Sequence, residues 1–236
     1  MEDTAIMSTL LAWLASQMGR ALFLPEPASA PDDERRVAFD RAYRAMLDAP
    51  SGSAIDDAVP RPRWQFLRYL VREKQMVLHG SNRPDIDILE PREQTDYGGR
   101  RITAVFGTRD AIWPLFFAVL NTAGYRGSVR NACWVVSRRG GEQRFYFFSV
   151  NREMVRPGLW APGTIYILPG ETFQMTDTAI VRFDEWASTE PVRPLARLAV
   201  EPADFPFLDQ VAAHREGESM LRSWLAYRRR RGAVAG

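Results

Sequence analysis

The sequence contains very few of the side chains that carry metal, redox or Schiff-base chemistry. Its 236 residues include one cysteine (Cys133), two histidines (His79 and His214) and one lysine (Lys74), against thirty arginines. A single cysteine excludes an intrachain disulfide and a cysteine-rich zinc site, and a single lysine argues against P-loop and Schiff-base enzymes. Two histidines leave little room for a histidine-rich metal centre, so we expect no metal. Any imidazole that the function needs must come from His79 or His214.

The chain also lacks a long hydrophobic run and an excess of charge of one sign. Its apolar N-terminal stretch follows two acidic residues and is interrupted by Ser8, Thr9, Ser16 and Gln17, unlike a signal peptide or a membrane-spanning helix. We therefore expect an amphipathic helix there, and a cytoplasmic protein without a membrane partner. The 31 basic and 29 acidic residues give a net charge of +2, which provides no general attraction to nucleic acid.

The order of predicted elements divides the chain into a helical region and a strand-rich region. With 46% hydrophobic and 25% charged residues, the chain has the composition of a soluble globular protein with one large core. Apolar residues at helical spacing predict helices over residues 5–23, 34–47 and 64–74. Later patterns predict strands over 76–81, 101–108, 163–170, 181–188 and 193–202, and helices over 110–121 and 216–231. We expect a helical region, residues 1–75, and a domain of residues 76–236 that together form one compact unit.

The strand-rich region has the pattern of an antiparallel fold. Residues 132–151 predict a β-hairpin around Gly140 and Gly141, since glycine supplies the positive φ angles of a tight turn. Many strands with few helices between them indicate an α+β fold with a largely antiparallel sheet. No G-x-G-x-x-G sequence opens a helix after a strand, so a Rossmann-type dinucleotide site has no support.

Two short segments combine residue types that can form a ligand site. The first is His79-Gly80-Ser81 at the end of a predicted strand, where glycine permits close backbone approach to a ligand. A lone histidine in such a place is more often structural. The second pairs Phe106, at the end of the next strand, with Phe117 on the following helix. Two such rings can enclose a flat aromatic group, or both can belong to the core.

A third segment, Phe183-Asp184-Glu185-Trp186, places two acidic residues between aromatic residues. Restricted access of water there can shift the pKa of an acidic side chain. The alternative interpretation of this segment is a surface turn.

In this order, the three segments resemble the motifs of the ADP-ribosyltransferase superfamily, in its diphtheria-toxin/poly(ADP-ribose) polymerase-like branch. That branch carries a His-Tyr-Glu triad on a split β-sheet. Its motifs are His-Gly-Ser or His-Gly-Thr at a strand end, an aromatic strand end with a second aromatic residue eleven positions later, and a glutamate beside an aromatic residue. The resemblance covers residues 76–200.

The chain departs from the pattern of this branch in its second motif. Phe106 stands where the branch usually has tyrosine, so the hydroxyl is missing but the stacking face remains. Gly107-Thr108 replaces the usual Phe-Ala. The assignment of the glutamate to Glu185 also has two alternatives in the sequence, Glu171 and Glu142.

The resemblance implies an enzyme that uses NAD as co-substrate and needs no metal. Such an enzyme cleaves the bond between nicotinamide and ribose and transfers ADP-ribose to an acceptor or, as a glycohydrolase, to water. It implies that Glu185 stabilises the positive charge that develops on the ribose. His79 would donate a hydrogen bond to the ribose hydroxyls, and Phe106 and Phe117 would enclose the nicotinamide ring.

The remaining contacts implied for NAD follow the first motif. The Gly80 backbone would pair with the nicotinamide amide, and Ser81 completes the motif beside it. Arg83 and Arg92 would bind the pyrophosphate, since arginine binds phosphate in bidentate fashion, although a surface role is the alternative for both. The acceptor can be a protein, a nucleic acid or a small molecule.

Two other interpretations remain open. The missing tyrosine hydroxyl favours a non-catalytic module that binds NAD or ADP-ribose on the same fold. The arginine run 228–231 and the pair Arg138-Arg139 favour a nucleic-acid-associated protein, although an arginine run at a helix end also complements the helix dipole.

Overall fold

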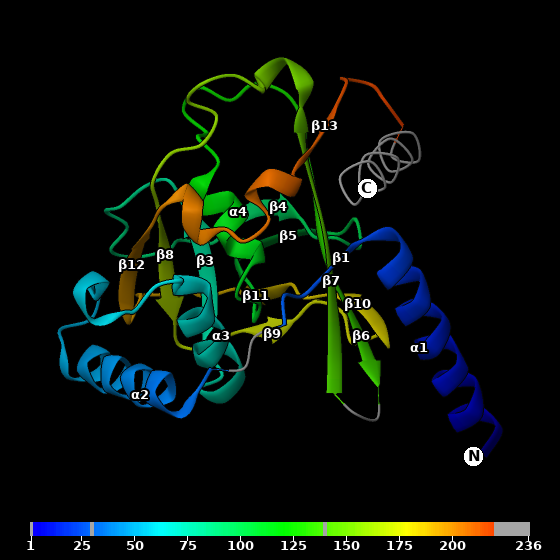
Figure 1. The fold of residues 1–236 in the computed structure, drawn as a ribbon, viewed down its shortest axis with the longest axis horizontal. Helices are drawn as coiled ribbons and strands as arrows, with labels where there is room; N and C mark the ends of the chain where they lie inside the picture. Colours follow the sequence, from blue (N-terminus) through cyan, green and yellow to red (C-terminus); the bar gives the residue numbers. More distant parts are fainter. Residues whose placement is uncertain (1, 29–30, 139–140, 220–236) are drawn as a thin grey trace.

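The computed structural model describes residues 2–28, 31–138 and 141–219, which form α-helices and three β-sheets (Figure 1). Three helices precede the strand-rich region, as the sequence predicts: α1 (Glu2–Leu22), α2 (Asp33–Asp48) and α3 (Arg63–Glu73). Asp32 caps α2 by accepting a hydrogen bond from the Arg35 amide at 2.8 Å. The inward side of α2 buries Phe39, Ala42 and Met46, whose spacing places them on one face of the helix.

The apolar residues of α1 do not all face the protein. Ala12, Ala15 and Gly19 lie on the side that packs against a sheet, and a Cβ on Gly19 would lie 2.6 Å from the Phe145 ring. The large apolar residues of this helix are exposed instead: Leu10, Leu11, Trp13, Leu14 and Met18. The expected helix is present, but its small residues, and not the large apolar residues on which the prediction rests, pack against the sheet. No helix in the described part of the chain is long and apolar enough to cross a membrane.

The first sheet is built on a long hairpin, which confirms the hairpin predicted over residues 132–151. Its strands are β6 (Val129–Arg138) and β7 (Gly141–Asn151). Arg138 pairs with Gly141 across the turn, and Gly141 has a φ of 115°, as a tight turn requires. Gly140 lies outside the described residues. Three short strands extend this sheet: β1 (Leu24–Pro25) and β13 (Ala212–His214) beside β7, and β10 (Val181–Phe183) beside β6.

The other two sheets meet at the predicted site. One has the order β4 (Arg92–Thr95), β5 (Arg101–Gly107), β11 (Trp186–Ser188), β9 (Gln174–Met175). The other has the order β2 (Ser53–Ala54), β12 (Ala196–Val200), β8 (Gly163–Leu168), β3 (Val77–Ser81). A bridge between Leu78 and Thr108 joins β3 to the end of β5. Among the described strands only β2–β12 and β7–β13 pair in parallel, so the expected α+β class with largely antiparallel sheets is confirmed.

Two predicted elements near the site are corrected by the structure. The strand predicted over 181–188 is two short strands, β10 and β11, which belong to different sheets. Asp184 and Glu185 form the break between them, because the chain passes here from one sheet to the next. The helix predicted over 110–121 is the shorter α4 (Trp113–Val119), since Asp110 lies outside its first turn.

Four short 3-10 helices complete the described elements: η1 (Asp56–Ala58), η2 (Arg152–Met154), η3 (Pro202–Asp204) and η4 (Leu208–Gln210), the last just before β13. The helix predicted over 216–231 does not begin at residue 216, because residues 216–219 form a turn and irregular chain. The rest of that segment, with the arginine run 228–231, lies outside the described residues, as does Arg139.

Helix α4 packs unusually closely on β3 and β8. A Cβ on Gly80 would lie 1.9 Å from the Pro114 carbonyl oxygen, and a Cβ on Gly163 would lie 1.8 Å from the Ala118 carbonyl oxygen. The helix backbone therefore occupies the space that a side chain would need at both positions. The packing of α4 is therefore a structural reason for glycine at position 80, beside its expected place near a ligand.

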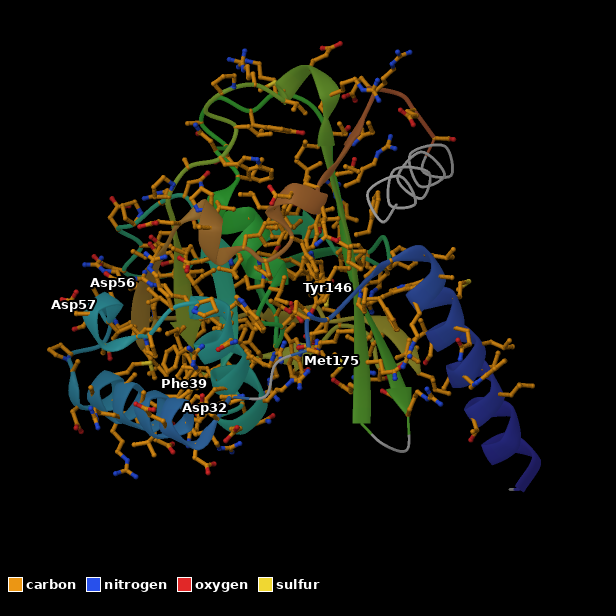
Figure 2. The ribbon with its side chains drawn as sticks, viewed as in Figure 1. Asp32, Phe39, Asp56, Asp57, Tyr146 and Met175 are labelled. Carbon is orange, nitrogen blue, oxygen red and sulfur yellow. The ribbon has the colours of Figure 1, made fainter. Side chains whose placement is uncertain are left out.

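One hydrophobic core joins the helical region to the sheets. Phe39 of α2 and Phe66 of α3 belong to the same buried cluster as Leu78 of β3, Tyr146 of β7 and Ile165 of β8. Figure 2 labels Phe39 and Tyr146, and both side chains are fully buried. Residues 1–75 and 76–236 thus share a core where both are described.

We expect Gly163→Ala to lower the free energy of unfolding by about 3 kcal/mol, because the new Cβ would overlap the Ala118 carbonyl group. This carbonyl belongs to the backbone of α4 and not to a flexible side chain. Urea unfolding followed by circular dichroism measures the change. Gly124→Ala is the matched control, since a Cβ there has nothing within 4 Å; we expect less than about 0.5 kcal/mol. Equal unfolding midpoints for the two variants would contradict the close packing of α4 on β8.

Candidate functional site

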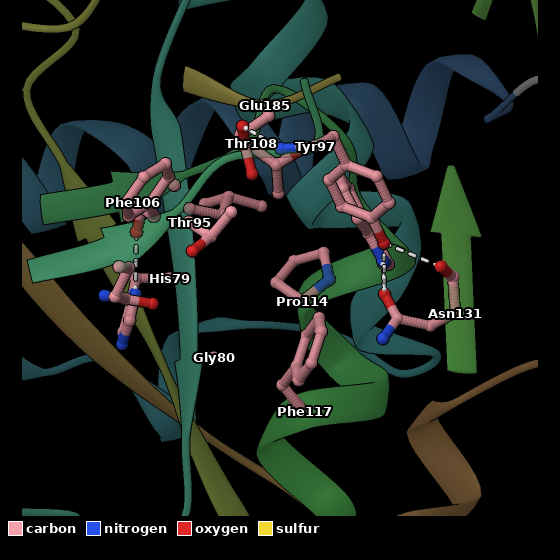
Figure 3. A pocket seen from close by; sticks show the side chains of 14 residues that line it. His79, Gly80, Thr95, Tyr97, Phe106, Thr108, Pro114, Phe117, Asn131 and Glu185 are labelled. Atoms are coloured by element: carbon pink, nitrogen blue, oxygen red, sulfur yellow. Dashed lines mark hydrogen bonds between the residues drawn. The ribbon is translucent and has the colours of Figure 1, made fainter. Parts of the chain in front are cut away.

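A cavity of about 320 Å³ opens between the ends of β3 and β5, helix α4 and the break before β11 (Figure 3). Its volume is typical of small-molecule sites. Five of the residues singled out in the sequence line it: His79, Gly80, Phe106, Phe117 and Glu185. The folding of the sheets therefore brings the three sequence segments together in one place.

His79 is held at the cavity by the end of β5. Its Nδ1 lies 2.9 Å from the Phe106 carbonyl oxygen, and because a carbonyl only accepts, Nδ1 carries a proton. Burial lowers the pKa of His79 below 6.5 and outweighs the opposite effect of this hydrogen bond. The ring is thus neutral at pH 7, and Nε2 is a hydrogen-bond acceptor. This corrects the expectation that His79 donates to a ribose hydroxyl; it would accept a hydrogen bond from one.

Glu185 lines the cavity from the break between β10 and β11, and only 9% of the residue is exposed. Its Oε1 accepts hydrogen bonds from the Tyr97 amide at 3.3 Å and from the Thr176 hydroxyl at 3.1 Å. Burial raises the pKa of Glu185 above 4.5, although both hydrogen bonds act in the opposite direction. A carboxylate shielded from water at a cavity wall suits electrostatic stabilisation or proton transfer.

The two alternative glutamates do not line this cavity. Glu142 begins β7, where it binds Arg144 at 3.0 Å and also contacts Arg182. Glu171 is exposed in the loop between β8 and β9. Of the three glutamates that the sequence offers, the geometry favours Glu185.

Aromatic rings form much of the cavity wall. Phe117 is 39% exposed, so it is not a core residue of α4. Its ring centroid lies 6.4 Å from that of Trp113, which in turn lies 5.5 Å from that of Tyr97. Phe106 lies beside His79 and apart from Phe117 (Figure 3). Flat apolar walls of this kind suit an aromatic ligand.

Tyr97 is a cavity residue that the sequence did not single out. It lies in the turn between β4 and β5, where its ring stacks on Phe183 with centroids 4.0 Å apart. Its hydroxyl lies 2.6 Å from the Asn131 carbonyl oxygen and 3.0 Å from the Asn131 Oδ1. Burial raises the pKa of Tyr97, so the hydroxyl stays protonated. The available sequence signal is an aromatic residue directly before Gly98-Gly99, at a turn between two strands.

Asn131 is a second residue that sequence reasoning missed. Its Oδ1 accepts a hydrogen bond from the Trp113 Nε1 at 2.7 Å, and because an indole only donates, the orientation of the amide is fixed. The NH2 group of Asn131 is therefore turned away from the Trp113 indole nitrogen. No motif marks this residue in the sequence, since it lies inside β6.

A second cavity of about 430 Å³ adjoins the first. The two cavities share the walls formed by His79, Gln94 and Phe106. The second cavity, not the first, is lined by the other residues predicted to bind NAD: Ser81, Arg83 and Arg92. The positive charge of Arg92 contributes to the lowered pKa of His79. The predicted site residues thus fall into two groups on either side of a shared wall.

The second histidine and the cysteine lie away from both cavities. His214 is fully buried, with Nδ1 2.8 Å from the Ser149 hydroxyl and Nε2 2.9 Å from the Ser128 hydroxyl. Burial raises the pKa of the Cys133 thiol, which keeps it protonated. Within residues 2–28, 31–138 and 141–219, no group of three or more histidine, cysteine or acidic side chains is placed to hold a metal ion.

Comparison with known proteins finds no match: no family model, no curated protein and no solved structure is similar to this chain.

We expect both histidines to titrate below pH 6.5, because burial lowers the pKa of each. Proton NMR measures this directly, and His79→Gln assigns the two signals. The unfolded chain takes up a proton near pH 6.5 and the folded chain only at lower pH, so the histidines make stability fall as the pH drops below 6.5. A His79 signal that titrates at or above pH 6.5 would contradict the neutral ring.

Proposed function

We propose that this chain is an NAD-dependent ADP-ribosyltransferase, or an NAD glycohydrolase where water is the acceptor. The observation that carries the proposal is that His79 and Glu185, from distant parts of the sequence, line one cavity with aromatic walls. The resemblance to the His-Tyr-Glu branch rests on the order of motifs along the chain. Their meeting in space is a separate observation that supports the same conclusion.

The two adjoining cavities suit the shape of NAD. Nicotinamide is flat and aromatic, and the first cavity offers Phe106 and Phe117 as walls. The pyrophosphate is anionic, and the second cavity offers Arg83 and Arg92 for it, although the acidic residues Asp85, Asp87 and Glu90 also line this cavity. His79 belongs to both cavities, so the ribose between nicotinamide and pyrophosphate would lie beside it.

The chemistry assigned to this site is the cleavage of an N-glycosidic bond. When the bond between the nicotinamide nitrogen and ribose C1′ breaks, its electron pair leaves with nicotinamide and positive charge develops on the ribose. The Glu185 carboxylate stabilises that charge in surroundings that contain little water. The same carboxylate takes the proton of the acceptor as the new bond to C1′ forms. His79 Nε2 accepts a hydrogen bond from a ribose hydroxyl and so orients the sugar.

A non-catalytic module that binds NAD or ADP-ribose is the second candidate. Phe106 favours it, since this ring lines the cavity without the hydroxyl of the family triad. Tyr97 brings a hydroxyl to the same cavity, but that hydroxyl is bound to Asn131. NAD binding without nicotinamide release would identify this alternative.

We expect Glu185→Gln to lower kcat for nicotinamide release from NAD by about 100-fold or more, with a small change in KM, because the carboxylate acts on charge present only in the transition state. Liquid chromatography of released nicotinamide measures the rate. The wild-type rate should fall as the pH drops toward the pKa of Glu185, with a midpoint above 4.5 because burial raises that pKa.

Glu171→Gln is the control for this experiment, since it removes the same charge from an exposed loop outside the cavity. We expect it to retain wild-type kinetics. Equal rates for Glu185→Gln and the wild type would remove Glu185 from the mechanism, and a wild-type protein that does not bind NAD at millimolar concentration would overturn the proposed function.

We expect Arg92→Ala to raise KM for NAD by about tenfold, because one charge-assisted contact to the pyrophosphate is lost. The affinity for free nicotinamide, which has no phosphate, should stay unchanged; calorimetric titration measures it. Arg101→Ala is the matched control, because Arg101 is an exposed arginine on the neighbouring strand β5 and lines neither cavity. An equal rise in KM for both variants would assign the effect to net charge and not to a site in the second cavity.

A further inference from the structure

The turn that carries Glu185 is tethered to three different parts of the protein. Phe183 stacks on Tyr97, and the Trp186 ring lies under the Arg109 guanidinium at 3.9 Å from its centroid. Asp184, between them, does not line the cavity and is only 3% exposed. Because Asp184 and Glu185 are adjacent in the chain, contacts that hold Asp184 also restrict the position of the Glu185 backbone.

Three side chains bind the Asp184 carboxylate. Arg144 Nη1 lies 2.5 Å from Oδ2, the Thr108 hydroxyl lies 3.3 Å from Oδ2, and the Trp186 Nε1 donates to Oδ1 at 2.9 Å. Arg144 comes from β7 and Thr108 from the end of β5, so Asp184 fastens the turn to two sheets. A buried carboxylate held by a cation and two neutral donors has little freedom to rotate.

The side chain of Glu185 has fewer constraints of its own. Its Oε1 has the two partners already described, the Tyr97 amide and the Thr176 hydroxyl, at distances above 3 Å. The charges nearest to it are Asp96 and Arg100, in the turn between β4 and β5. The position of the Glu185 backbone is therefore the main determinant of where its carboxylate lies.

We infer that Asp184 is a positioning residue, which aims Glu185 into the cavity through its buried contacts with Arg144, Thr108 and Trp186. Asp184 is not itself among the residues that line the cavity, although Thr108, which binds it, is one of them. The role of Glu185 in NAD cleavage rests on the proposed function, whereas the position and titration of Glu185 do not.

The test compares Asp184→Asn with Glu142→Gln. Both remove one carboxylate from Arg144, but Glu142 is 39% exposed and lies on the hairpin outside the cavity. Carbon-13 NMR of the glutamate carboxyl groups, assigned with Glu185→Gln, follows the pKa of Glu185. In Asp184→Asn we expect this pKa to move toward 4.5, because a loosened turn exposes the carboxyl group to water. In Glu142→Gln it should stay where it is in the wild type.

Nicotinamide release gives the second measurement. We expect kcat of Asp184→Asn to fall about tenfold or more with little change in KM, and the acid side of its pH profile to move to lower pH. A loss of folded protein alone would lower the rate equally at every pH. Wild-type values of both the Glu185 pKa and kcat in Asp184→Asn would overturn the inference.

Trp186→Phe separates the effect of the position of Glu185 from the effect of the charge of Asp184, because it changes no charge. It also replaces Asp184→Asn if that variant does not fold. It removes only the indole hydrogen bond to Asp184 and keeps a ring beside Arg109. A shift of the Glu185 pKa in the same direction supports the inference, since no charge has changed; no shift overturns it. If the pKa shifts occur but the wild type releases no nicotinamide, the proposed function fails and the positioning of Glu185 by Asp184 stands.

Discussion

Behind the cavity, the positive charge of a single buried arginine compensates the negative charges of two buried carboxylates. Arg144 Nη1 lies 2.5 Å from Asp184 Oδ2 and 3.5 Å from Asp110 Oδ2, and each of the three side chains is 8% exposed or less. Burial alone would lower the pKa of Arg144, but the two carboxylates outweigh this effect and raise it. Removing one partner of a buried ion pair typically costs about 3–5 kcal/mol, since the remaining charge is left unpaired. The shape of the cavity depends on this compensation.

The two walls of the cavity are connected through the same arginine. On one side, Asp110 caps α4 by accepting hydrogen bonds from the amides of Ile112 and Trp113 at 2.8 and 2.6 Å, and α4 carries the aromatic wall. On the other side, Asp184 precedes Glu185. Because Arg144 lies on β7, the central hairpin fixes the distance between the aromatic wall and the glutamate. A ligand that enters the cavity meets groups that are already in place, which reduces the cost of ordering them.

Local patterns in the sequence predict the elements of this fold, and they fail where the structure depends on contacts between distant segments. Helical spacing is enough to predict α2 and α3, and Gly141 is enough to predict the hairpin turn. The break at Asp184 and Glu185 appears in the sequence only as two consecutive polar residues, and the change of sheet there depends on pairing with distant strands. Three segments of the candidate site are recognisable as motifs. Tyr97 and Asn131 are not, since their place in the cavity comes from hydrogen bonds between a turn and a strand of another sheet.

The large excess of arginine over lysine has a partial explanation in these contacts. Arg144 binds Asp184 through Nη1 and Glu142 through Nη2, and Arg182, also buried, contacts Glu142 and donates to the Ser137 hydroxyl at 2.6 Å. A planar guanidinium can bind several partners at fixed angles, whereas an ammonium is a compact and strongly hydrated charge. The single lysine, Lys74, lies near the surface against two tyrosine rings, where a compact charge is sufficient. Where charge is buried behind the cavity, this geometry favours arginine, and lysine at the position of Arg144 would keep the charge but lose the fork that binds Asp184 through Nη1 and Glu142 through Nη2.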